Sequence, residues 1–197
     1  MLFRSFGWKH HTAGWKQWGL AMQDDVTDGV KNLISQGVVD ASRVCIIGAS
    51  YGGYATMYGL AKDPDLYRCG VNWVGVTDVK MLFTVTWSVM SGPYMDNLGR
   101  LMHGDPDKDG AYFEKTSAIG NAARIKAPVL MGYGSEDIRV PLIHGEKMRD
   151  KLRAQGNEVE WVVMTGEEHN WYREANRIAW GEKVEKFLGK HLAPASK

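Results

Sequence analysis

Residues 48–53 read Gly-Ala-Ser-Tyr-Gly-Gly, and they lie between an apolar run at residues 44–47 and a helix-compatible stretch at residues 54–61. This order predicts a strand, a sharp turn and a helix, with Ser50 at the turn. Glycines at both ends of the Gly-x-Ser-x-Gly pattern are expected to let the strand and helix close around a strained turning residue. A serine hydroxyl is a weak nucleophile, and it needs a base and a third group that orients the base. Ser50 is therefore a candidate nucleophile whose partners lie elsewhere in the chain.

Asp137 and His169 are the candidate partners, because they follow Ser50 in the order serine, acid, histidine that this architecture requires. Asp137 comes after an apolar run at residues 128–131, and His169 comes after a strand-like run at residues 159–164. All three side chains are thus expected just beyond the carboxyl ends of parallel strands. Open α/β sheets gather their functional groups at that edge.

Each of these assignments has a plainer alternative. A chain with 23 glycines can contain the Gly-x-Ser-x-Gly pattern by chance, and an aspartate in a loop after a strand is often a turn residue. Glu136 directly precedes Asp137 and competes for the acid role. The chain has six histidines, and among them only His169 lies in the loop directly after the last predicted strand. The convergence of the three residues on one sheet edge favours the catalytic interpretation.

Length and charge indicate a single domain over residues 1–197, large enough to bury its own core. The 24 lysines and arginines nearly balance the 23 aspartates and glutamates, so the composition gives no sign of a nucleic-acid or anionic-membrane partner. Small neutral or mixed substrates fit this balance better. The sequence shows neither a membrane-spanning run nor a signal peptide, so a cytoplasmic location is the default expectation.

The order of helical and extended patterns predicts an α/β fold with a mostly parallel sheet covered by helices on both faces. An amphipathic helix is predicted at residues 19–36. Strands are expected at residues 43–48, 69–75, 128–133 and 158–164. Further helices are expected at residues 52–63, 141–154 and 172–191. Residues 77 to about 125 form an insertion rich in methionine and aromatic residues, which we expect to fold as a helical cap over Ser50.

The two cysteines lie near the starts of two successive predicted strands, at Cys45 and Cys69. If these strands are neighbours, their spacing of about 4.8 Å allows a disulfide bridge. Buried free thiols are the favoured expectation, because free cysteine is commonly a core residue.

Metal-binding patterns are weak in this sequence. It contains no Cys-x-x-Cys and no His-Glu-x-x-His. Residues 105–110 imitate the start of a calcium-binding loop, but Thr116 stands where a bidentate glutamate is required and Pro106 is an awkward second residue. No metal is expected.

Further motifs accompany the serine turn in a fixed order: Asp63-Pro-Asp-Leu-Tyr-Arg with Cys69-Gly-Val, Gly104-Asp-Pro, Ile125-Lys-Ala-Pro-Val-Leu, Asp137-x-Arg-Val-Pro and Gly166-Glu-x-His169. With this set, nearly the whole chain resembles the catalytic domain of the prolyl oligopeptidase family of serine hydrolases. The acylaminoacyl and dipeptidyl peptidases are the most similar branch.

The resemblance implies an α/β-hydrolase fold that works without a cofactor, with Ser50 as nucleophile, His169 as base and Asp137 as the residue that orients it. It also implies a primary substrate pocket in the loop after the strand that follows the nucleophile. The residues that correspond to this pocket are Val76, Val79, Leu82 and Tyr94.

The chain departs from the family pattern at its amino-terminal side. The large β-propeller of family members and the first strands of their hydrolase domain, with a His-Gly-Gly-type turn, have no counterpart in it. The oxyanion hole is affected, because the Tyr51 amide supplies one donor while the second normally comes from that upstream region. Phe6 occupies the family's aromatic position at this site but offers no hydroxyl. Loss of one donor typically lowers the rate about 10²–10³-fold.

The strand at residues 44–47 would then have an apolar edge without an evident neighbour, and such an edge invites pairing. We therefore expect a homo-oligomer that covers this edge, or covers the exposed core with the arm at residues 1–18, which carries Trp8, Trp15 and Trp18. The competing expectation is that the arm folds back over its own edge.

Three functional interpretations follow. The favoured one is an esterase-like serine hydrolase that cleaves small acyl esters through an acyl-enzyme on Ser50, because esters have the easier leaving group. The second is a serine peptidase of acylaminoacyl or dipeptidyl type. The third is an inactive fragment or an assembly scaffold that retains the three residues only by descent.

Overall fold

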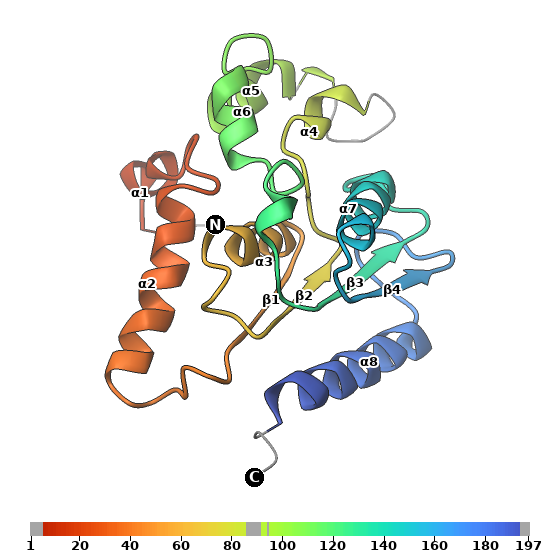
Figure 1. The fold of residues 1–197 in the computed structure, drawn as a ribbon. Coiled ribbons are helices and arrows are strands. Elements are labelled where there is room, and N and C mark those ends of the chain that lie inside the picture. The colour runs from red at the N-terminus through yellow and green to blue at the C-terminus, as the bar shows by residue number, and fades with distance from the viewer. Residues whose placement is uncertain (1–5, 86–91, 94, 194–197) are drawn as a thin grey trace.

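The computed structural model describes residues 6–85, 92–93 and 95–193, and it contains a four-stranded sheet (Figure 1). The order of strands across the sheet is β1-β2-β3-β4, and each neighbouring pair is parallel. Their bounds are β1 (Cys45–Ala49), β2 (Cys69–Trp73), β3 (Val129–Gly134) and β4 (Val159–Met164). The predicted parallel sheet is confirmed, with strand ends that differ from the prediction by a few residues.

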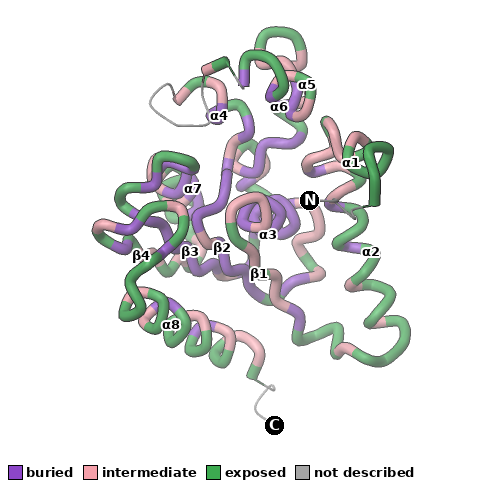
Figure 2. Tube along the Cα trace, turned by 180° about the vertical axis from the view of Figure 1, so that it is seen from behind, coloured by how far each residue is buried: buried purple, intermediate pink, exposed green. Residues whose placement is uncertain are grey.

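Helices cover both faces of this sheet (Figure 1). The long helix α8 lies against one face, while α3 and α7 lie against the other. Figure 2 shows that buried residues concentrate in α3 and the central strands β2 and β3, whereas α2 and α8 are largely exposed. The bounds of these helices are α2 (Ala21–Ser35), α3 (Tyr51–Lys62), α7 (Ile143–Ala154) and α8 (Glu174–Leu192).

The two-sided core explains the sequence of β3. Successive residues of a strand point to opposite faces, so Met131 and Tyr133 pack with residues of α3 and α7. Leu130, which directly precedes Met131, packs with Trp180 and Phe187 of α8 on the other face. Every residue of β3 is buried, as is typical of a central strand in a parallel sheet.

The insertion between β2 and β3 contains several short helices in its described residues, and its role as a cap over Ser50 stays a prediction. Its first short helices gather away from the sheet, whereas the last one contacts α3 and α7 (Figure 1). These elements are α4 (Met81–Thr84), the π-helix η1 (Met95–Gly99), α5 (Arg100–His103), α6 (Gly110–Thr116) and the 3₁₀-helix η2 (Ala122–Arg124).

The calcium-like run in this insertion is neutralised by basic side chains. Asp105 forms an ion pair with Arg100, which also lies 3.0 Å from Asp107. Asp109 accepts a hydrogen bond from Lys16 at 2.8 Å. The carboxylates therefore tie the insertion together and link it to the amino-terminal segment.

Strand β1 is an edge of the sheet formed by the described residues. Ile47 in this strand is 55% exposed, and the short helix α1 (Trp8–Ala13) contains no buried residue. Trp18 packs its ring on Tyr51 and on Tyr54 of α3. The arm thus folds back in part, onto α3, and the homo-oligomer stays a prediction. Within the described residues, no helix is both long and apolar enough to cross a membrane.

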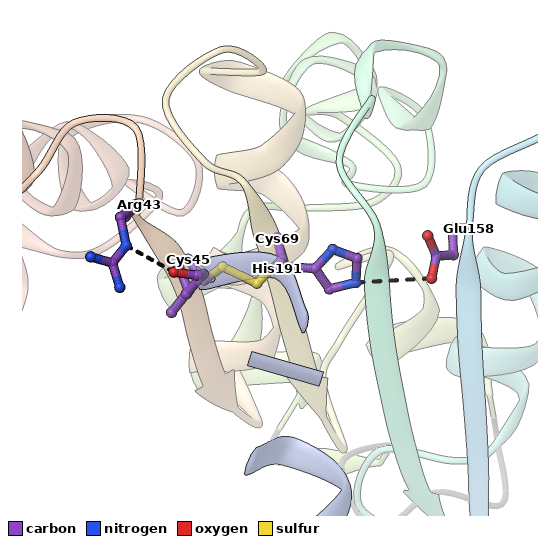
Figure 3. The surroundings of a disulfide bond; sticks show 6 residues. Arg43, Cys45, Cys69, Glu158 and His191 are labelled. Carbon is purple, nitrogen blue, oxygen red and sulfur yellow. Dashed lines mark hydrogen bonds and ion pairs between the residues drawn. A yellow bond between two sulfur atoms is a disulfide. The ribbon is translucent and has the colours of Figure 1, made fainter. Parts of the chain in front are cut away.

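A disulfide joins Cys45 of β1 to Cys69 of β2 (Figure 3). The favoured expectation of two free thiols is therefore wrong, and the alternative of a bridge is correct. The reason is the register of the two strands, which pairs these two residues directly, with 4.7 Å between their Cα atoms. Arg43, just before β1, donates a hydrogen bond to the carbonyl of Leu192 at 2.8 Å and so links this end of the sheet to α8.

Candidate active site

Ser50 lies at the turn between β1 and α3 in a backbone conformation that L-residues rarely adopt. Its φ is 57° and its ψ is −117°, and strained conformations of this kind concentrate at functional sites. The turn is held from both sides, because the Ser50 amide donates to the Trp73 carbonyl at 2.9 Å and the Ser50 carbonyl accepts from the Tyr54 amide at 3.1 Å. The side chain is thus presented at the carboxyl end of β1.

The two glycines that flank Ser50 have different roles. A Cβ atom on Gly48 would lie 2.3 Å from backbone atoms of Gly52, whereas a Cβ atom on Gly52 would meet nothing within 4 Å. The expectation that both positions must be small for steric reasons is therefore correct for Gly48 and wrong for Gly52. The strand approaches the helix backbone at position 48, while the missing side chain of residue 52 would point into open space.

Replacing Gly48 by Ala is expected to lower the free energy of unfolding by about 2–3 kcal/mol, because backbone must move to admit the methyl group. Gly52→Ala is the matched control, and we expect it to leave stability unchanged or to raise it by up to about 1 kcal/mol, since alanine favours a helix. Urea unfolding of the two variants measures both effects. Equal stability of the two variants would contradict the steric account.

The three candidate residues lie within hydrogen-bond distance of one another. His169 Nε2 is 2.9 Å from Ser50 Oγ, and His169 Nδ1 is 2.8 Å from Asp137 Oδ2. They come from three separate loops, after β1, β3 and β4, at the predicted edge of the sheet. The imidazole therefore bridges the hydroxyl and the carboxylate, with one ring nitrogen facing each.

Asp137, and not its neighbour Glu136, faces the histidine. The Asp137 residue is 2% exposed, and its Oδ1 accepts hydrogen bonds from the amides of Arg139 and Val140, both at 2.8 Å. This leaves Oδ2 for His169 Nδ1. Since a buried carboxylate fixed in this way is an acceptor only, it favours the tautomer in which Nδ1 carries the proton and Nε2 is free to accept. Glu136 is exposed.

Glu167 supports the site through contacts that the sequence does not predict. The Gly-Glu-x-His motif contains this residue but does not indicate what it contacts. It is 1% exposed, and its carboxylate accepts hydrogen bonds from the amides of Tyr172 and Arg173 and from the Asn176 side chain. Burial acts to raise the pKa of Glu167, but these hydrogen bonds lower it overall. Its carbonyl also accepts from the Glu136 amide at 2.9 Å. Glu167 thus joins the loop of the histidine to the loop of the acid.

The oxyanion candidates differ in their placement. Tyr51 is the first residue of α3, and amides in the first turn of a helix have no partner within the helix and lie at its positive end. Phe6 is 89% exposed and its ring contacts His10. The places of Tyr51 and Phe6 in an oxyanion hole stay predictions.

The predicted pocket residues Val76, Val79 and Leu82 are buried together in the main core cluster, which also contains Val140 of the acid loop. Tyr51 packs against this cluster from the nucleophile turn. The fourth predicted residue, Tyr94, lies outside the described residues. The loop after β2 is therefore packed beside the site, and its role as a pocket wall is still a prediction.

A parallel sheet whose strand enters a helix through a strained serine, with an acid and a histidine on later loops, defines the α/β-hydrolase fold. Solved structures share this fold. A puromycin-hydrolyzing peptidase from Mycobacterium tuberculosis aligns with a TM-score of 0.84 and 22% identity over 94% of this chain and 27% of that chain. An acylaminoacyl peptidase from Pyrococcus horikoshii aligns with a TM-score of 0.81 and 22% identity over 94% of this chain and 30% of that chain.

Residues 4–195 match the prolyl oligopeptidase family, and the chain belongs to this family. Among characterised relatives, dipeptidyl aminopeptidase BIII from Pseudoxanthomonas mexicana is 33% identical over 189 residues, which cover 95% of this chain and 27% of that protein. The chain thus spans about a quarter of the length of this relative. The resemblance noted from the sequence motifs is confirmed at the level of the family.

Proposed function

We propose that this chain is a serine hydrolase of the peptidase class, which cleaves an amide bond in a peptide-like substrate through an acyl-enzyme on Ser50. The observation that carries this proposal is the line of contacts from Ser50 Oγ through the His169 ring to Asp137, at 2.9 and 2.8 Å. A relative that is named a dipeptidyl aminopeptidase and neighbours that are named peptidases favour peptide substrates over the esters expected from the sequence.

In the proposed reaction the Ser50 proton is transferred in two steps, first to His169 and then to the leaving amine. As Ser50 Oγ bonds to the substrate carbonyl carbon, its proton passes to His169 Nε2, and Asp137 stabilises the imidazolium that forms. When the tetrahedral intermediate breaks its carbon–nitrogen bond, His169 gives this proton to the leaving amine. Water then attacks the acyl-enzyme with His169 again as base, which releases the acid and restores Ser50.

Ester hydrolysis is a second candidate, favoured by the oxyanion site. The Tyr51 amide is the donor that the turn at Ser50 supplies. The Phe6 side chain is 89% exposed. Amide cleavage depends more strongly on a complete set of donors and on proton delivery to a poor leaving group. A site with one donor would turn over activated esters more readily than anilides.

The proposal is tested by turnover of an aminoacyl p-nitroanilide and a short p-nitrophenyl ester, each with the wild-type protein and with Ser50→Ala. We expect both activities in the wild type and neither in the variant. Ester turnover alone would favour the second candidate. Absence of both activities, together with absence of fluorophosphonate labelling at Ser50, would overturn the proposal in favour of an inactive fragment or scaffold.

A further inference from the structure

His144 is a buried histidine that takes no part in the proposed proton transfers. It is the second residue of α7, the helix that follows the loop of Asp137. Its side chain is completely buried, at 0% exposure. Burial of a polar ring costs free energy unless its nitrogen atoms form hydrogen bonds.

The His144 ring has its hydrogen bond with Thr77, which also bonds to the His144 carbonyl, while the His144 amide donates to the Pro141 carbonyl at 2.9 Å. The Thr77 amide donates to His144 Nδ1 at 3.3 Å, and the Thr77 hydroxyl donates to the His144 carbonyl at 2.8 Å. Because Nδ1 is an acceptor here, the ring proton resides on Nε2, which has no hydrogen-bond partner among the described residues. Burial lowers the pKa of His144 to about 4, so the ring stays neutral and able to accept at neutral pH.

Thr77 lies in the loop between the predicted pocket residues Val76 and Val79, and this loop is fixed by several elements. The Thr77 carbonyl accepts from the Ile119 amide at 2.9 Å, at the end of the insertion. The Tyr133 hydroxyl of β3 donates to the Gly75 carbonyl at 2.7 Å. His144 supplies the side-chain acceptor for the Thr77 amide, which would otherwise be a buried donor without a partner.

The same loop touches the start of the nucleophile helix. A Cβ atom on Gly53, in the first turn of α3, would lie 2.5 Å from the Gly75 Cα atom. The two backbones are therefore in close contact, so the loop after β2 is packed against the first turn of the helix that follows Ser50. His144 and Thr77 link this loop to α7, the element that follows the acid.

We infer that His144 is a positioning residue that acts through Thr77 to fix the loop at residues 76–79, and with it the substrate-facing wall beside Ser50. This inference rests on the proposed function, because it assigns a role in substrate binding. It concerns affinity for substrate more than the chemical step, since neither ring nitrogen of His144 contacts Ser50, His169 or Asp137 in the hydrogen bonds of the described residues.

Two variants of His144 separate this role from simple filling of space. Asparagine places its Oδ1 at the same number of bonds from the backbone as His144 Nδ1, so His144→Asn can still accept from the Thr77 amide. His144→Leu has the same number of side-chain heavy atoms and the same branching as asparagine but offers no acceptor. Leucine is the bulkier of the two and fills more of the space of the ring, so a larger defect in His144→Leu than in His144→Asn reports the hydrogen bond and not the filling of space.

The test measures KM and kcat of His144→Asn and His144→Leu on the ester and anilide that show Ser50-dependent turnover. We expect His144→Leu to raise KM about tenfold, with kcat within about threefold of the wild type, because an orphaned buried amide forces the loop to shift. His144→Asn should restore KM to within about twofold. If His144→Leu does not fold, His144→Val, which likewise offers no acceptor, replaces it, and a raised KM in that variant supports the positioning role.

Equal kinetic constants in the asparagine and leucine variants, or an unchanged KM in His144→Val where it is used, would overturn the positioning role. Failure of the proposed function looks different. In that case the wild-type protein itself shows no turnover that Ser50→Ala removes, and both proposals fall. Wild-type turnover with no distinction between the two His144 variants removes only the positioning role.

Discussion

Asp137→Asn is expected to lower Ser50-dependent turnover about 10⁴-fold, by the logic that holds for serine, histidine and aspartate triads in general. The Asp137 carboxylate now accepts from His169 Nδ1 at 2.8 Å. An asparagine that keeps its oxygen on the amides of Arg139 and Val140 must turn its NH₂ group toward the ring. His169 Nδ1 then becomes the acceptor, and the proton moves to Nε2, where it blocks removal of the Ser50 proton.

The matched control for this change is Glu136→Gln, which makes the same chemical substitution one position earlier. Glu136 is exposed, and we expect its variant to keep turnover within about twofold, since its charge is screened by solvent. Steady-state kinetics on the ester and the anilide measure both variants, and thermal unfolding verifies that both are folded. If Glu136→Gln lost activity and Asp137→Asn kept it, the acid would be Glu136.

The sequence was sufficient to find the elements that carry the site, because each rests on a local signal. The turn at residues 48–53, the apolar runs before Asp137 and His169, and the topology of parallel sheets jointly place three side chains at one edge. The choice of Asp137 over Glu136 did not follow from the sequence pattern alone. It depends on which carboxylate accepts the amides of residues 139 and 140, and this is a property of the folded loop.

Other features depended on contacts between distant residues and were outside the reach of sequence patterns. Gly48 and Gly52 look equivalent in the motif, but only Gly48 faces backbone at short range. The link between Thr77 and His144 joins residues far apart in the sequence, and neither residue lies in a motif that suggests it. The sequence alone does not decide the disulfide, because the register of β1 and β2, and not only their adjacency, determines whether the two cysteines meet.

The Cys45–Cys69 bridge is expected to supply a large share of the stability, so that the paired variant Cys45→Ala/Cys69→Ala loses about 3–4 kcal/mol of the free energy of unfolding. The bridge spans a sequence separation of 24 residues, and closing a loop of this size restricts the unfolded chain considerably. Urea unfolding of the oxidised wild type and of the paired variant measures the difference. Reduction of the wild type before unfolding should reproduce most of it.

The bridge stabilises β1 in particular, because of the place of this strand in the sheet. Within the described residues β1 pairs on one side only, with β2, so the bridge reinforces the one lateral attachment of the strand that leads into Ser50. At the other end of β1 the Ser50 amide still donates to the Trp73 carbonyl, and we therefore expect the paired variant to retain Ser50-dependent turnover below its unfolding transition. Unfolding midpoints that coincide for the oxidised wild type, the reduced wild type and the paired variant would contradict a stabilising bridge. Loss of turnover in a fully folded paired variant would show instead that the bridge also shapes the nucleophile turn.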